Sequence, residues 1–222
     1  MKIQCLVHNL KENIMSAERL TSKNQTLPIL GSVFLGVEKD GIKIRATNLE
    51  SALEINLPGK VYEAGFLVLP ARALNMFLSG VFEEQITLES KKNNLFIRTI
   101  KTESVFRGYP PEDFPIFPKT EILEKFYISS SELKESLASV GVASSISDIK
   151  PELNSIFFNM FKNTIKFAAT DSFRLAERSI TSKSFHLDKQ VSFLVPQKTI
   201  IELLKLLDRK DEDISVGTNK NQ

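Results

Sequence analysis

The 222-residue sequence is poor in the residues on which catalysis and metal binding most often depend. It contains one cysteine, Cys5, and two histidines, His8 and His186. One cysteine cannot form a disulfide within the chain, and a zinc site of the cysteine-histidine type needs more ligands than these. Neither the phosphate-binding loop pattern nor the dinucleotide-binding glycine pattern occurs. We therefore expect no metal, no cofactor and no intrinsic catalysis, and we expect Cys5 to be a small core residue.

The sequence also lacks a long apolar run and an excess of charge of either sign. No run reaches the roughly 18 apolar residues that a membrane-crossing helix needs, and the N-terminus has neither the apolar core nor the cleavage site of a secretory signal. Lysine and arginine number 29 against 27 aspartate and glutamate, a net charge of +2. We expect a globular cytoplasmic protein without a membrane partner. Any DNA binding must come from basic residues gathered on one surface.

An internal repeat is the main feature that the sequence does contain. Segments match in the same order at a constant offset of 123 residues, and a further slip of three brings one more pair into line. The matching pairs are 3–14 with 126–137, 30–35 with 153–158, 46–48 with 169–171 and, after the slip, 69–70 with 195–196. Such ordered matches indicate one supersecondary plan that is used at least twice.

Periodicity predicts the elements within each copy. Alternation over 3–7 is typical of a strand, and apolar residues three and four apart over 10–20 are typical of an amphipathic helix. Asp-Gly at 40–41 indicates a hairpin turn. Further strands are expected over 32–37, 41–47, 49–57, 84–90, 95–101, 103–107, 126–128, 155–160, 164–170, 174–180 and 214–216, and further helices over 71–79, 130–140 and 197–208. The predicted fold class is α+β, with two helices packed on antiparallel sheets in each of two tandem repeated domains.

Proline and repeat length set the expected domain boundaries. Residues 109–118 hold four prolines, which predicts a stiff extended connector. We assign 1–118 to the first domain, 119–125 to a linker and 126–222 to the second domain. The second copy has no match to 95–107, so a complete sheet would lack two strands. We expect this domain to be truncated at its C-terminal end and the chain to be a fragment.

Several segments carry a resemblance to a known family. They are Leu-Pro-Ile-Leu at 27–30, Ala-Thr-Asn-Leu-Glu at 46–50, Pro-Ala-Arg at 70–72, the proline-rich stretch 110–115, Ala-Thr-Asp-Ser-Phe-Arg-Leu-Ala at 169–176, and 196–208. In this order they resemble the bacterial DNA polymerase III beta subunit family of sliding clamps, over essentially the whole chain. The resemblance implies the DNA clamp fold: a ring of two identical chains, each with three copies of one domain, helices lining the hole and sheets forming the rim. It thus implies a third domain, absent here.

The resemblance implies sequence-independent binding of double-stranded DNA, which a ring holds by topology with basic residues on its inner helices. The residues that match family positions near DNA are Lys23, Asn24, Arg72, Lys198 and Lys205. The alternative is that these are ordinary solvated helix residues. Acidic neighbours favour that alternative: Glu12, Glu18, Glu135 and Glu202.

The resemblance also implies protein partners and a dimer. The family's peptide groove binds the DNA polymerase III alpha subunit, the clamp loader and other proteins with clamp-binding motifs. The matching groove residues are Leu153, Thr170, Ser172, Phe173, Arg174 and Leu175. Phe106 matches part of the contact that makes the full-length family a homodimer. The alternatives are that Leu153 and Leu175 are core residues and that Phe106 is a core residue of a strand.

Three functional hypotheses follow. The leading one is a DNA sliding clamp, a processivity factor that encircles duplex DNA and tethers the replicative polymerase. The alternative is a two-domain peptide-binding scaffold that does not encircle DNA. The third, a small hydrolase using Asp171 and Ser172, is disfavoured because no third catalytic group accompanies them.

Overall fold

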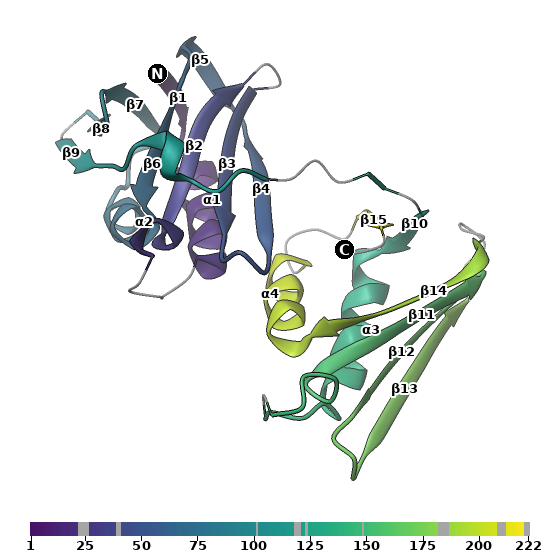
Figure 1. The fold of residues 1–222 in the computed structure, drawn as a ribbon. Coiled ribbons are helices and arrows are strands. Elements are labelled where there is room, and N and C mark those ends of the chain that lie inside the picture. Colours follow the sequence, from purple (N-terminus) through teal and green to yellow (C-terminus); the bar gives the residue numbers. More distant parts are fainter. Residues whose placement is uncertain are drawn as a thin grey trace. The chain divides into compact units, whose positions relative to one another are not determined.

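The computed structural model describes residues 1–21, 27–38, 41–100, 102–117, 121–122, 124–147, 149–181, 187–207 and 212–219. The chain divides into two compact units, Met1–Pro118 and Lys119–Gln222, each with its own hydrophobic core (Figure 1). The expected turn at Lys39-Asp40 and the side chains of Lys23, Asn24 and His186 lie outside the described residues.

The first domain is built from two antiparallel sheets and two helices. One sheet has the strand order β4-β3-β2-β6 and the other the order β5-β1-β7-β8-β9. Its elements are β1 (Lys2–Leu6), α1 (Val7–Leu20), η1 (Pro28–Gly31), β2 (Ser32–Glu38), β3 (Gly41–Thr47), β4 (Ala52–Leu57), β5 (Gly59–Glu63), β6 (Gly65–Pro70), α2 (Ala71–Ser79), β7 (Gln85–Lys91), β8 (Asn94–Arg98), β9 (Glu103–Arg107) and η2 (Pro111–Asp113).

The second domain repeats this plan. Its elements are β10 (Glu124–Ser129), α3 (Ser130–Gly141), β11 (Ser155–Lys162), β12 (Thr164–Thr170), β13 (Leu175–Thr181), β14 (Leu187–Pro196), α4 (Gln197–Leu207) and β15 (Asp213–Thr218). The sheets have the orders β13-β12-β11-β14 and β10-β15. By the repeat, β2 is equivalent to β11, β3 to β12, β4 to β13 and β6 to β14. The equivalent strands follow the same spatial order in the two sheets.

Strand register confirms the repeat at single-residue resolution. Ser32 pairs with Pro70 between β2 and β6, and Ser155 pairs with Pro196 between β11 and β14. The two serines are 123 positions apart and the two prolines 126, so the slip of three arises before β14 and leaves the pairing unchanged.

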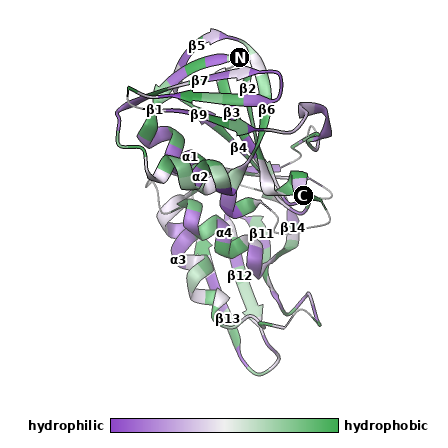
Figure 2. Ribbon diagram, turned by 90° about the vertical axis from the view of Figure 1, so that its left-hand side faces the viewer, coloured by the Kyte–Doolittle hydropathy of each residue, from purple (hydrophilic) through white to green (hydrophobic). Residues whose placement is uncertain are grey.

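Amphipathic helices cover one face of each sheet. Leu10, Ile14 and Ala17 of α1 are fully buried at spacings of four and three, as the periodicity predicts. The helices carry both hydrophilic and hydrophobic residues (Figure 2). Cys5 is a buried core residue, as expected, and burial raises the pKa of its thiol to about 12. None of the helices in the described ranges has the length and apolar character needed to cross a membrane.

The helix α1 begins earlier than its apolar stripe suggests, whereas α3 begins at Ser130 as expected. Val7, assigned from its alternation to a strand, is the first residue of α1. Its N–H donates to the carbonyl of Glu84 at 3.0 Å, and the N–H of Ser130 at the start of α3 donates to Glu212 at 2.9 Å. A neighbouring chain segment thus binds an N–H that the helix itself leaves unpaired, so the helix starts without a side-chain cap.

Sequence periodicity missed three strands and displaced several strand starts by one to three residues. β5, β6 and β14 were not predicted. The strand expected over 49–57 begins at Ala52, since Leu49 has a φ of +75° and lies in a turn. The strand expected over 174–180 begins at Leu175. The proline-rich connector is also not fully extended, because it contains η2 and packs on the first domain.

Candidate nucleic-acid and peptide interfaces

Basic residues recur at equivalent helix positions in the two domains. Lys11 of α1 and Lys134 of α3 are 123 positions apart, and Arg72 of α2 and Lys198 of α4 are 126 apart, the offsets of the repeat. Arg72 and Lys198 are each the second residue of their helix, and both are exposed. A positive charge therefore stands at the same place on the second helix of each domain.

Helix stability does not explain these two charges. The N-terminal turn of a helix carries the positive end of its dipole, so a cation there is disfavoured by a few tenths of a kcal/mol up to about 1 kcal/mol. Arg72 and Lys198 occupy that turn, and neither makes an ion pair with another of the described residues. Helix stability therefore does not account for a cation at either position.

The acidic neighbours on the helices are largely engaged by other protein groups. Glu135 pairs with Arg178 of β13 at 2.9 Å, and this hydrogen bond lowers the pKa of the Glu135 carboxyl. Glu18 accepts a hydrogen bond from Asn75 of α2. The charge of Glu135 is therefore compensated within the domain, whereas Glu18 has a neutral amide as its partner.

Lys205 is the exception among the predicted DNA contacts. Its ammonium lies 2.8 Å from Glu202 on the same helix, so part of its charge is compensated locally. The described residues therefore rank Arg72 and Lys198 ahead of Lys205 as anion-binding candidates.

The turn between β12 and β13 brings five of the six predicted groove residues together. One carboxylate oxygen of Asp171 accepts the N–H groups of Phe173 and Arg174, at 2.9 and 2.8 Å. The hydroxyl of Thr170 donates to the carbonyl of Arg174 at 2.6 Å and accepts the N–H of Ser172 at 3.1 Å. Ser172 has a φ of +78°. These bonds to backbone N–H groups lower the pKa of the Asp171 carboxyl.

The same turn occurs in the first domain, bond for bond. Asn48 accepts the N–H groups of Glu50 and Ser51 at 3.0 and 2.7 Å. Thr47 donates to the carbonyl of Ser51 at 2.8 Å and accepts the N–H of Leu49 at 3.0 Å. In both domains a threonine followed by an aspartate or asparagine supplies the side-chain oxygens that bind the backbone of this turn.

The side chains that differ between the two turns identify what the second turn adds. Phe173, Arg174 and Leu175 stand where the first domain has 50–52, Glu-Ser-Ala. Phe173 is 96% exposed and Leu175 72%, so neither is a core residue. The expectation that Arg174 lies inside a strand is wrong, because Arg174 precedes β13 and its guanidinium pairs with Asp171 at 3.0 Å. The result is an exposed apolar pair that flanks a fixed cation.

Leu153 lies in the loop that precedes β11 and is half-buried. Because Phe157 of β11 pairs with Ala168 of β12, the chain before β11 and the turn after β12 lie at the same end of the sheet. Sequence reasoning missed two further apolar side chains in this loop, Ile146 and Ile149, which are both strongly exposed. They are identified by their exposure, which is a property of the folded chain and cannot be read from the sequence.

Phe106 lies in β9, the edge strand of its sheet. Its ring meets Phe77 of α2 edge-on at 5.2 Å between centroids, and both side chains pack against the core while remaining partly exposed. The neighbouring Val105 is exposed. Phe106 therefore has both a core contact and an accessible surface.

Within the described ranges, no group of three or more histidine, cysteine, aspartate or glutamate side chains could hold a metal ion. Charged clusters on the sheet surfaces are ion pairs, such as Arg45 with Glu38 and Glu54, both at 2.6 Å.

Comparison with known proteins assigns the two domains to one family. The model described as DNA polymerase III beta subunit, N-terminal domain, matches residues 1–118, and the model described as its central domain matches residues 127–222. The chain belongs to the DNA polymerase III beta subunit family.

Curated relatives in this family are named beta sliding clamp. The protein of Buchnera aphidicola subsp. Rhopalosiphum padi is 26% identical over 222 residues, 95% of this chain and 58% of the relative. That of Staphylococcus epidermidis is 26% identical over 210 residues, 90% of this chain and 55% of the relative. The chain thus spans less than two thirds of the length of these relatives.

Solved structures of the family have the same fold. A putative DNA polymerase III beta subunit from Eubacterium rectale superposes with a TM-score of 0.93 at 23% identity, covering all of this chain and 60% of the other. The DNA polymerase sliding clamp of Bacillus subtilis gives 0.91 at 23% identity, covering 99% and 60%. The predicted fold class, α+β with tandem clamp-type domains, is confirmed.

Proposed function

We propose that this chain contributes two domains to a DNA sliding clamp, a ring that encloses double-stranded DNA and acts as a processivity factor. The observation that carries the proposal is the exposed cation repeated at the start of α2 and α4, Arg72 and Lys198. A ring that slides must attract phosphates without reading bases, and exposed cations at equivalent positions of each domain meet that need. Family membership supports the same function.

In this proposal the DNA-facing set is Arg72, Lys198 and Lys205, together with Lys23 and Asn24 of the loop before β2. The protein tethers other enzymes and performs no chemistry of its own. It acts in the cytoplasm, where bacterial DNA is replicated.

The proposed protein partners bind through apolar peptides. Exposed Phe173 and Leu175 supply apolar surface, and Arg174 offers a cation that Asp171 holds in place. This surface suits a short peptide with hydrophobic and acidic or carbonyl groups. By family membership we propose the DNA polymerase III alpha subunit, the clamp loader and other clamp-binding-motif proteins as its partners.

The proposed ring is a homodimer in which the β9 edge and Phe106 contribute to the contact between subunits. An edge strand with partly exposed aromatic and β-branched side chains is suited to pairing with a second chain. The Phe77 ring, which packs edge-on against Phe106, supports that surface from α2.

Salt-dependent DNA binding tests the DNA part of the proposal. We expect the double variant Arg72→Gln, Lys198→Gln to bind a duplex more weakly than the parent chain. The slope of log K against log salt should fall by about 1.8, since each phosphate contact contributes about 0.9. Fluorescence anisotropy with a labelled duplex at several salt concentrations gives both quantities.

The matched control is Lys60→Gln, Lys125→Gln, which removes two cations from strands instead of helices. Both lysines lie over tyrosine rings on β5 and β10. Equal loss of affinity in the control and in the helix variant would contradict the proposal.

The peptide-binding scaffold remains the second candidate, because the apolar pair at the turn between β12 and β13 is present whether or not DNA binds. It predicts a different pattern in the same experiment. Duplex affinity would be negligible at low salt, while peptide binding would depend on Phe173 and Leu175. Peptide titration of Phe173→Ser beside the salt series separates the two functions.

A further inference from the structure

The segment that follows β9 lies on the outer face of the first domain's sheet, the face opposite the helices (Figure 1). The N–H of Tyr109 donates to the carbonyl of Val68 in β6 at 2.8 Å. The ring of Phe114 is buried, with its centroid 5.7 Å from that of Phe34 in β2. Residues 109–117 are therefore a strap that is docked on β2 and β6.

Two aromatic side chains hold the end of this strap, and they differ in how firmly they are held. Phe114 is 7% exposed, whereas Ile116, two positions later, is 93% exposed. Phe117 is half-buried. The centre of its ring lies 6.4 Å from that of Phe114 and 5.8 Å from the guanidinium carbon of Arg45. Phe114 is therefore a buried anchor, and Phe117 is a second anchor that depends on its contact with Arg45.

Arg45 is held in place by groups outside the strap. Its guanidinium pairs with Glu38 and Glu54, both at 2.6 Å, and lies 5.4 Å from the ring centre of Phe34. These partners belong to β2 and β4, the strands on either side of the β3 strand that carries Arg45. Arg45 keeps them when Phe117 leaves, so release of Phe117 breaks no ion pair of the sheet.

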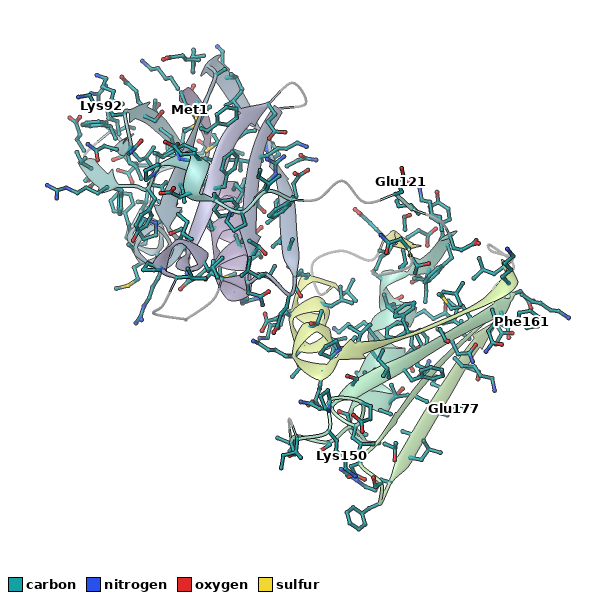
Figure 3. The ribbon with its side chains drawn as sticks, in the orientation of Figure 1. Met1, Lys92, Glu121, Lys150, Phe161 and Glu177 are labelled. Atoms are coloured by element: carbon teal, nitrogen blue, oxygen red, sulfur yellow. The ribbon has the colours of Figure 1, made fainter. Side chains whose placement is uncertain are left out.

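The chain between the two domains is short while Phe117 is docked. Six residues, 118–123, separate Phe117 from Glu124, the first residue of β10, and Glu121 lies in this connector (Figure 3). A fully extended chain from Phe117 to Glu124 spans about 25 Å at most. Release of residues 115–117, with Phe114 still buried, raises this limit by about 10 Å. The contact between Phe117 and Arg45 therefore limits how far the second domain can move from the first.

We propose that Phe117 and Arg45 form a latch that sets the reach between the two domains. A single contact between a cation and a partly exposed ring changes the ratio of docked to released states by only a few-fold, so the latch opens in the native protein. The buried Phe114 stops the strap from peeling further. In the proposed ring, which opens to admit duplex DNA, the added reach lets the domains separate without unfolding. That use rests on the proposed function, whereas the latch itself does not.

Distances between spin labels on the two domains test the latch. The labels are attached through Lys92→Cys in the turn between β7 and β8 and Lys150→Cys in the loop before β11, two exposed positions (Figure 3). Cys5 is buried and does not compete for the label. Pulsed electron paramagnetic resonance on the labelled 222-residue chain gives the distribution of distances.

Phe117→Ser should broaden this distribution and raise its upper limit by up to about 10 Å, the reach that residues 115–117 add. Arg45→Gln should produce the same change, because it removes the other half of the latch. The Phe117→Ser variant leaves the ion pairs of Arg45 intact, so it tests the latch even if Arg45→Gln destabilises the sheet. Thermal unfolding of each variant verifies that the first domain remains folded.

The matched control is Ile116→Ser, which removes an exposed apolar side chain from the adjacent position of the strap. It should leave the distribution unchanged. The proposal is overturned if Phe117→Ser gives the distribution of the parent chain, or if Ile116→Ser broadens it equally. A broadening that a folded Arg45→Gln variant does not reproduce would also overturn it, because Arg45 would then not hold the ring. None of these results bears on DNA binding by Arg72 and Lys198, which the salt series measures separately.

Discussion

At the residue scale, Asp171 joins the backbone of the turn to the cation beside it. One of its oxygens binds two backbone N–H groups, and the other binds the guanidinium of Arg174. Asn48 makes the same backbone bonds in the first domain without a charge. The comparison separates the two roles: the amide or carboxylate oxygen shapes the turn, and the negative charge positions Arg174.

The lowered pKa of Asp171 gives this residue a pH signature. A carboxyl whose folded-state pKa is depressed stabilises the fold above its unfolded pKa, near 3.9, and this stabilisation is lost as pH falls through the folded value. We therefore expect Asp171→Asn to lose less of its thermal stability than the parent chain between about pH 5 and about pH 2. Calorimetry of the second domain's transition measures the difference.

The control for this prediction is Glu152→Gln, which removes an exposed carboxylate from the loop before β11 in the same domain. Its pH dependence should match that of the parent chain. If Asp171→Asn loses stability with acid as steeply as the parent does, the bonds to Asp171 contribute nothing measurable and the account of the turn is wrong.

At the element scale, residues 109–117 form a strap that lies on β2 and β6. The position of this strap depends on a close approach of the backbone at one glycine. Gly108 donates its N–H to the carbonyl of Asn93 at 2.7 Å, directly before the strap reaches Val68. A Cβ at Gly108 would collide with the carbonyl oxygens of both residues. The chain can enter the face of β6 at this point because position 108 has no side chain.

Gly108→Ala is therefore expected to lift the strap and destabilise the first domain by about 2 kcal/mol, in the range of substitutions that force a buried backbone shift. Urea unfolding followed by circular dichroism gives the free energy. Gly80→Ala, at the end of α2, is the matched control, because its Cβ would meet its nearest neighbour at an ordinary 3.6 Å. A Gly108→Ala chain as stable as this control would show that the strap is not held where the structure has it.

The elements also show how far the sequence alone reaches. Both helices of each domain and the strands over 41–47 and 103–107 follow from periodicity, because each of these elements buries one face. β6 was missed because the strap covers its second face, so its apolar run has no alternation to detect. The strand expected over 174–180 includes Arg174, whereas Arg174 lies in the turn before β13 and pairs with Asp171. Periodicity could not predict this, because the ion pair exists only in the folded chain.

The candidate sites, too, could be predicted only in part from the sequence. Residue identity, with the family resemblance, named Phe173, Arg174 and Leu175, and the repeat offset relates Arg72 to Lys198. The exposure of Phe173 could not be predicted from the sequence, because it depends on which segments of the folded chain cover this side chain. Lys23 and Asn24 lie outside the described residues, and their role stays a prediction.

At the scale of the whole molecule, the proposed clamp function rests on the repetition of one domain. The two domains share strand order, register, turn chemistry and the cation that begins the second helix. A ring assembled from such domains would present these cations many times around one hole, and would hold DNA by enclosure instead of by base contacts. Weak individual phosphate contacts are then an advantage, because strong ones would prevent sliding.

Retention on closed DNA tests this central claim most directly. The native protein, isolated from its own cells, is loaded on a nicked circular plasmid and passed through a sizing column at high salt, before and after the plasmid is cut once. The account predicts that the protein remains with the circle when salt has removed phosphate attraction, and that it leaves when the DNA becomes linear. Equal retention on circular and linear DNA, or none on either, would contradict the sliding clamp.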